Sequence, residues 1–125
     1  MAGTIVANTI NTDTGLFSTQ NAYQGIAKAW VNFSYTGTIA GSFNVSSITV
    51  GGTGTYTINF ATAMPNSNYS VLGSCSGTSP ASTASAPCIA VAPNSTTACS
   101  ALTYQSQAVG NQTSLSYNFV AVFSS

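Results

Sequence analysis

Apolar and polar residues alternate along most of this chain, and this period of two constrains the fold more than any other feature. In Thr55–Phe60 every second residue is large and apolar, and Ser114–Phe123 carries apolar residues on both of its faces. Successive side chains of a β-strand point to opposite faces, so this pattern is typical of strands. No long stretch follows the helical period of 3.6 residues. We therefore expect an all-β protein.

The middle of the chain contains the clearest hairpin. The segment Phe43–Val50 leads into the glycine-rich turn Gly51–Gly54, and Thr55–Phe60 forms the returning strand. Glycine adopts positive φ angles at no steric cost, as tight hairpin turns require. The pair Ser46-Ser47 interrupts the alternation, which predicts a β-bulge at this point.

Further strands and loops follow from the same pattern. Pro93 is expected to end a strand, because proline cannot donate a ladder hydrogen bond. The segment Leu16–Ala27 is ambiguous between a loop and one or two helical turns. The remaining expected strands are Lys28–Ser34, Asn68–Cys75, Cys88–Ala92 and Ser100–Gln107, and the expected loops are Tyr35–Gly41, Ala61–Asn68 and Gly77–Pro87.

Together these segments predict one antiparallel β-sandwich of six to eight strands over residues 28–125. Residues 1–27 would then form an N-terminal arm or attachment segment. Within it, Thr4–Ile10 alternates apolar and polar residues, so Ile5, Val6 and Ile10 are the candidate contacts for docking on a neighbouring molecule. The longest apolar stretches are far shorter than the roughly 20 residues of a membrane span. The first eight residues lack the basic region of a signal peptide.

The chain has almost no charged side chains that could take part in catalysis or hold a charged ligand. Lys28 and Asp13 are its two charged residues, and it contains no histidine. The chain has no histidine to transfer a proton, no second carboxylate for a glycosidase pair and no arginine to bind a phosphate. We therefore expect no enzyme and no cofactor. Nucleic acids and anionic membranes are held largely by Lys and Arg, so neither is expected as a partner. Copies of Asp13 gathered in an oligomer would suit a cation, but two solvated charges are the simpler interpretation and no metal site is predicted.

The three cysteines, Cys75, Cys88 and Cys99, leave two interpretations open. They form one disulfide and one free thiol, or they are reduced and act as small apolar residues. Their spacing does not match a zinc site.

One long run of the sequence resembles small virion proteins and tail-fibre segments of bacteriophages. It consists of Ala27–Phe33, Ser42–Thr49, Gly52–Phe60 and Ala63–Val71, and the opening Gly3–Thr12 is similar to the leading segment of such fibre proteins. The pattern Pro65-Asn66-x-x-Tyr69 is similar to the tail-fibre C-terminal domain that resembles H-type lectins. That resemblance implies a lectin- or jelly-roll-like sandwich that assembles as a homotrimer.

The resemblance leads to two functional hypotheses. The first is a non-enzymatic structural protein on the virion surface, assembled in the host cytoplasm and bound to other virion proteins as a head decoration, head fibre or short tail appendage. The second is a receptor-binding, lectin-like tip module that binds host glycan. A secreted bacterial adhesin subunit is the alternative outside viruses.

For the second hypothesis, the candidate receptor contacts are Tyr35, Trp30, Asn66 and Asn68. Aromatic rings stack on sugars, and amides supply adaptable hydrogen bonds. A single tryptophan within an apolar strand is more commonly a core or interface residue, so Trp30 has two interpretations.

Overall fold

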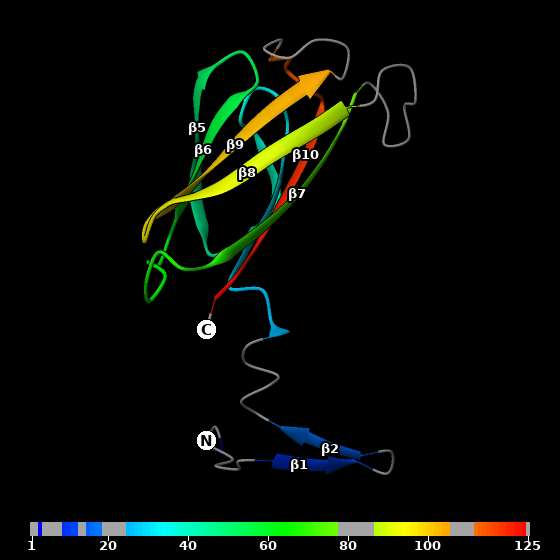
Figure 1. The fold of residues 1–125 in the computed structure, drawn as a ribbon, viewed down its shortest axis with the longest axis vertical. Coiled ribbons are helices and arrows are strands. Elements are labelled where there is room, and N and C mark those ends of the chain that lie inside the picture. The colour runs from blue at the N-terminus through cyan, green and yellow to red at the C-terminus, as the bar shows by residue number, and fades with distance from the viewer. Residues whose placement is uncertain are drawn as a thin grey trace.

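The computed structural model describes residue 3 and residues 9–12, 15–18, 25–77, 87–105 and 112–124. The described residues form ten strands (Figure 1): β1 (Thr9–Thr12), β2 (Gly15–Ser18), β3 (Ala29–Phe33), β4 (Ile39–Phe43), β5 (Val45–Gly52), β6 (Thr55–Phe60), β7 (Ser70–Ser76), β8 (Pro87–Ser95), β9 (Ala98–Gln105) and β10 (Tyr117–Phe123).

Eight of these strands form an antiparallel β-sandwich, which confirms the predicted fold class. One sheet has the order β4-β3-β10-β7 and the other has the order β5-β6-β9-β8. The doubly apolar strand near the C-terminus, β10, lies in the interior of its sheet between β3 and β7. This position matches the prediction for a strand that carries apolar residues on both faces.

The core lies between the two sheets and is built by alternation within each strand. In β6 the residues Tyr56, Ile58 and Phe60 are buried, whereas the residues between them are only partly covered. The Phe33 and Tyr56 rings, from opposite sheets, meet edge to face with centroids 5.1 Å apart. Aromatic rings prefer this geometry because the positive edge of one ring faces the negative face of the other.

The predicted central hairpin is confirmed from Val45 onward, but Phe43, expected in its first strand, belongs to β4. Strands β5 and β6 pair with Ile48 opposite Ile58, and the register shifts between Val45 and Ser47, as expected for a bulge at Ser46. Gly54 in the turn has a φ of 66°, in the left-handed region that favours glycine.

The expected loop Tyr35–Gly41 is wrong in its second half, because Ile39–Phe43 forms β4. This strand contains Ala40, Gly41 and Ser42, so its sequence has little of the β-branched, alternating character that marks a strand. It forms because it pairs with β3 at the edge of the sheet, with a register shift between Asn32 and Phe33.

The expected strand end at Pro93 is also wrong. Strand β8 continues to Ser95, and Pro93 lies opposite Cys99 of β9. Because β8 is the edge strand of its sheet, one of its sides has no ladder partner, and proline is tolerated on such an edge.

Near the N-terminus, β1 and β2 form a separate two-stranded sheet in which Ile10 lies opposite Phe17. Part of the ambiguous segment Leu16–Ala27 is therefore strand. The arm residues Ile5 and Val6 lie outside the described residues, as does Asp13. Over the part of the chain that is described, no helix is long and apolar enough to cross a membrane.

Candidate functional site

The most unusual surface of the sandwich is the outer face of the sheet β4-β3-β10-β7. In β3, Ala29, Val31 and Phe33 point into the core, so Trp30 points outward and stays 44 % exposed. In β10 the same alternation buries Val120 and leaves Phe119 41 % exposed. Trp30 is therefore not a core residue, and an interface residue and a sugar-stacking platform are the two interpretations that remain.

Four apolar side chains form a row across this sheet, one from each strand. Trp30 lies opposite Phe43 on one side and opposite Ala121 on the other, and Ala121 in turn lies opposite Leu72. Phe43 and Leu72, at the two ends of the row, are 54 % and 62 % exposed. We call the outward-facing set Trp30, Phe43, Leu72, Tyr117, Phe119 and Ala121 the aromatic face.

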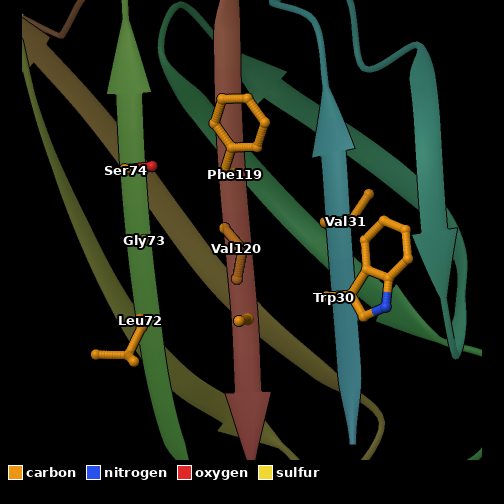
Figure 2. A pocket seen from close by; sticks show the side chains of 8 residues that line it. Trp30, Val31, Leu72, Gly73, Ser74, Phe119 and Val120 are labelled. Carbon is orange, nitrogen blue, oxygen red and sulfur yellow. The ribbon is translucent and has the colours of Figure 1, made fainter. Parts of the chain in front are cut away.

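A shallow hollow lies within the aromatic face. It has a volume of about 350 Å³, and Trp30, Leu72 and Phe119 line it above a floor that includes Val120 and Gly73. Figure 2 shows these three side chains projecting from three adjacent strands around the hollow, with Ser74 beside Phe119. No charged residue lines it.

The indole of Trp30 lies over Gly41 of the neighbouring strand β4. A Cβ atom at Gly41 would be 3.5 Å from the indole carbon Cζ3 and 3.6 Å from Cη2. These are ordinary van der Waals distances, so the ring already covers this position. The indole is thus held against the backbone while its other face is open to solvent, as a stacking or docking surface requires.

A second hollow adjoins the aromatic face at Phe43. Its volume is about 360 Å³, and its lining includes Ile26, Lys28 and Met64 in addition to Phe43. Ile26 is 60 % exposed, so the apolar surface continues past the carboxyl end of β4.

The structure does not bring the four predicted receptor contacts together. Tyr35 is 52 % exposed and follows the carboxyl end of β3, where its carbonyl oxygen accepts a hydrogen bond from the Tyr56 hydroxyl. Asn66 and Asn68 are exposed in the loop before β7, and the Asn66 side chain accepts the Asn68 N–H at 2.8 Å. Their neighbour Pro65 lines the hollow beside Lys28, which precedes β3. The two asparagines and Tyr35 thus lie near opposite ends of β3.

Sequence reasoning found Trp30 but missed Phe43, Leu72 and Phe119. Each of them occupies an outward position in a strand whose other side packs in the core. A sequence signal exists for Phe119, because β10 is apolar on both faces. Phe43 and Leu72 join the same row only through the pairing of β4 with β3 and of β7 with β10, which the sequence does not encode locally.

The three cysteines are free thiols at different depths: Cys99 is buried, Cys75 is half-buried and Cys88 is exposed. Burial raises the pKa of the Cys99 thiol to about 11. Burial, and then the neighbouring Cys88, raise the pKa of Cys75 to about 11 as well. Among the residues that the structure describes, no group of three or more His, Cys, Asp or Glu side chains is placed to hold a metal ion.

Fold and surface together define a β-sandwich module with an uncharged aromatic face. Comparison of the chain with protein-family models, with curated proteins and with solved structures found no match.

Proposed function

We propose that this chain is a non-enzymatic structural protein of a bacteriophage particle, a homotrimer displayed on the virion surface, whose aromatic face is the contact between subunits. The observation that carries the proposal is the row Phe43, Trp30, Ala121 and Leu72, which crosses all four strands of one sheet and is open to solvent in the single chain. Large apolar patches of this kind mark interaction sites. The phage assignment and the trimer rest on the sequence resemblance.

A second copy of the same chain is the occupant that best fits this face. Complete burial of a large apolar side chain contributes about 1.5–3 kcal/mol, so covering the exposed half of Trp30, Leu72 and Phe119 contributes about 1 kcal/mol for each residue. A partner with charged groups would lose solvation without gaining an ion pair, because no charged residue lines the hollow. The chain itself presents a surface built from Ser, Thr, Asn and apolar groups, so it matches this face in chemistry.

The composition supports a structural rather than a catalytic role. The chain contains no histidine and a single acidic residue, so no carboxylate pair and no imidazole is available for proton transfer. Serine and threonine are abundant, but a nucleophilic mechanism would need Lys28 as its base.

A receptor-binding, lectin-like module that binds host glycan is the second candidate, and the geometry of Trp30 favours it. The indole lies over Gly41, beside a hollow edged by the Ser74 side chain. Trp30 lies on one side of this hollow and Ser74 lies on the other side, beside Phe119, so a glycan stacked on the indole would have the Ser74 hydroxyl across the hollow as a hydrogen-bond donor.

Light scattering coupled to size exclusion tests the first proposal. We expect a trimer whose mass does not change in high salt, because the contact contains no ion pairs to screen. Leu72→Lys places a charge in the row at an exposed position of an edge strand, so it should yield folded monomers. Ala90→Lys is the matched control, since Ala90 is exposed on β8, the edge strand of the other sheet. A wild-type monomer at all concentrations would refute the trimer.

The glycan alternative has its own readout. Binding of the chain to immobilised host-surface glycans, abolished by Trp30→Ala and retained in Tyr35→Ala, would favour the receptor-binding module. A folded trimer that binds no glycan would leave the structural role as the better supported function.

A further inference from the structure

The second hollow, beside Phe43, combines an apolar lining with one cationic residue. Met64 is buried in it, whereas Ile26 and Phe43 line it with more than half of their surface exposed. Lys28 also lines the hollow and is the only cationic side chain of the sequence. Binding sites are typically hollows of about this size with mostly apolar walls and a few polar groups that fix the orientation of the occupant. The hollow therefore suits an apolar segment that carries one acidic group.

Hydrogen bonds hold the walls of this hollow in place. The N–H of Lys28 donates to the carbonyl oxygen of Val122 at 2.7 Å, and the Asn44 side-chain amide donates to the carbonyl oxygen of Lys28 at 3.0 Å. The N–H of Met64 donates to the carbonyl oxygen of Thr96 at 2.7 Å. Because these backbone segments are already fixed, an occupant gains apolar contact without the cost of ordering the site.

The hairpin β1–β2 stands by itself among the described residues. Its two strands pair with each other in a sheet of their own, and Figure 1 shows them well apart from both sheets of the sandwich. The sequence of the hairpin includes Ile10, Leu16 and Phe17. A two-stranded hairpin is only marginally stable in water unless a further strand or another element packs against it. This hairpin therefore needs an apolar surface to dock on.

The two charged residues of the chain are divided between the hairpin and the hollow. Strand β1 ends at Thr12 and β2 begins at Gly15, so Asp13 stands in the chain between the two strands. Asp13 is outside the described residues, and this placement follows from the sequence. Docking of the hairpin in the hollow brings the only acidic side chain to Lys28, the only basic one. Such charge complementarity fixes the register of a contact and selects the partner.

We propose that the hairpin β1–β2 of one subunit docks in the hollow of a second copy of the chain, with its Asp13 beside the partner subunit's Lys28. The inference rests on the proposed homo-oligomer and names a segment that links its subunits. The hollow shares Phe43 with the aromatic face, so the docked hairpin continues the proposed subunit contact. A second copy is the occupant that fits, because the hairpin extends away from its own sandwich (Figure 1).

Apolar contact provides most of the affinity of this docking, and the ion pair sets its orientation. An exposed ion pair contributes little to affinity and is screened by salt. The mass of the trimer should therefore still be unchanged in high salt. The yield of any reaction that requires Asp13 and Lys28 to touch should fall under the same conditions.

Zero-length cross-linking with a carbodiimide tests the contact on the full chain, which has one carboxylate side chain and one amine side chain. The carboxylate and the amine condense to an amide, and the carbodiimide takes up the water and becomes a urea. Unlabelled and ¹⁵N-labelled chains are unfolded together, refolded, cross-linked at low salt and digested with chymotrypsin. We expect mass spectrometry to find a link between Asp13 and Lys28. Links between a light and a heavy peptide should be as frequent as links within one isotope.

Variants separate docking from chance reaction. Lys28→Arg keeps the charge but has no primary amine, so the link should vanish while the trimer keeps its mass. The double exchange Asp13→Lys with Lys28→Asp should restore the link, because the two charges are complementary again. Ile26→Ser removes an exposed apolar side chain from the hollow and should lower the yield of the link about tenfold. Tyr35→Ser is the matched control, since Tyr35 is similarly exposed but lies outside the hollow.

Two results would overturn this inference while leaving the proposed function intact. One is a trimer in which Lys28 is linked to the C-terminal carboxylate and never to Asp13. The other is a trimer in which every Asp13–Lys28 link joins peptides of one isotope, since the hairpin would then dock on its own chain. A wild-type monomer, measured by light scattering on the same sample, would overturn both the docking and the proposed trimer.

Discussion

Trp30 of β3 lies directly opposite Phe43 of β4 on the outer face of the sandwich, and its indole covers Gly41 of the same neighbouring strand. Cross-strand aromatic pairs stabilise a sheet by roughly 0.2–1 kcal/mol relative to alanine pairs. This pair therefore holds the edge strand β4 in place and leaves about half of each side chain open to solvent. The same two side chains therefore stabilise the sheet and form part of the surface that we propose as the subunit contact.

Truncation of this pair should affect assembly more than folding. Trp30→Ala and Phe43→Ala are each expected to lower the free energy of unfolding by about 1 kcal/mol, since both side chains are only half-buried. Self-association should weaken at least tenfold, because each variant removes apolar area from the contact. Urea unfolding measures the first effect, and sedimentation equilibrium measures the second.

Tyr35→Ala is the matched control for these two variants. Tyr35 is an aromatic residue with 52 % exposure, but it follows β3 and lies outside the aromatic face. Its truncation should leave the association constant unchanged. Equal weakening by all three substitutions would show that the aromatic face is not the contact.

A methyl group at Gly54 should destabilise the sandwich strongly. Gly54 has a φ of 66°, and a Cβ atom there would be 2.7 Å from the carbonyl oxygen of Thr103 and 2.9 Å from the backbone N of Thr113. These neighbours are backbone atoms that cannot move aside easily. Gly54→Ala is expected to cost about 3 kcal/mol or more in the free energy of unfolding.

Urea unfolding of Gly54→Ala and Gly25→Ala side by side measures this cost. A Cβ atom at Gly25 would have no atom within 4 Å, so this control should change stability by less than about 0.5 kcal/mol. Similar curves for wild type and Gly54→Ala would mean that the turn is not as closely packed as described.

The sequence predicted those parts of the fold in which local pattern and tertiary packing agree. The hairpin β5–β6 carries alternation, a bulge signal at Ser46 and a glycine turn, and all three were found. Strand β10 is apolar on both faces, which correctly placed it inside a sheet. In contrast, β4 is recognisable only through its pairing with β3, and the tolerance of Pro93 depends on β8 being an edge strand.

The candidate site could be predicted less well, for the same physical reason. Trp30 was identified because tryptophan is rare in this chain, but its neighbours on the face come from β4, β7 and β10. Their meeting depends on strand order and register, which are set by long-range pairing. Tyr35, Asn66 and Asn68 were candidate contacts by residue type alone, and the structure places Tyr35 and the two asparagines near opposite ends of β3.

The hydroxyl of Tyr69 ties the loop before β7 to the turn between β8 and β9. It lies 2.6 Å from the carbonyl oxygen of Ala98 and 2.8 Å from that of Ser95, and it accepts the N–H of Asn94 at 3.3 Å. Tyr69→Phe keeps the ring that packs on Phe60 and removes the hydroxyl. We expect a loss of about 1–3 kcal/mol, because buried backbone groups lose their partner.

Tyr35→Phe removes a hydroxyl from an exposed ring and should have no measurable effect on stability. Thermal and urea unfolding of the two variants provide the comparison. If Tyr69→Phe were as stable as wild type, the hydroxyl would be replaceable by water and the turn would not depend on it.

The stability of the reduced protein should depend on pH only on the alkaline side. Burial raises the pKa of Cys75 and Cys99 from 9.0 to about 11, and it raises the pKa of Tyr56 and Tyr69 above 10.0. Each raised pKa means that the folded state holds its proton more tightly than the unfolded state. The stability from these groups is therefore complete below about pH 9 and is lost as the pH rises through about 11.

Melting temperatures of the reduced chain between pH 4 and pH 11 test this prediction. With Asp13 as the only acidic side chain, Tm should change little between pH 4 and pH 8 and then fall from pH 9 upward. Cys99→Ala removes one of the buried acids, so its Tm should fall less steeply over the alkaline range than that of wild type. A Tm that stays constant up to pH 11, or that drops by many degrees at pH 4, would contradict this account of the titrating groups.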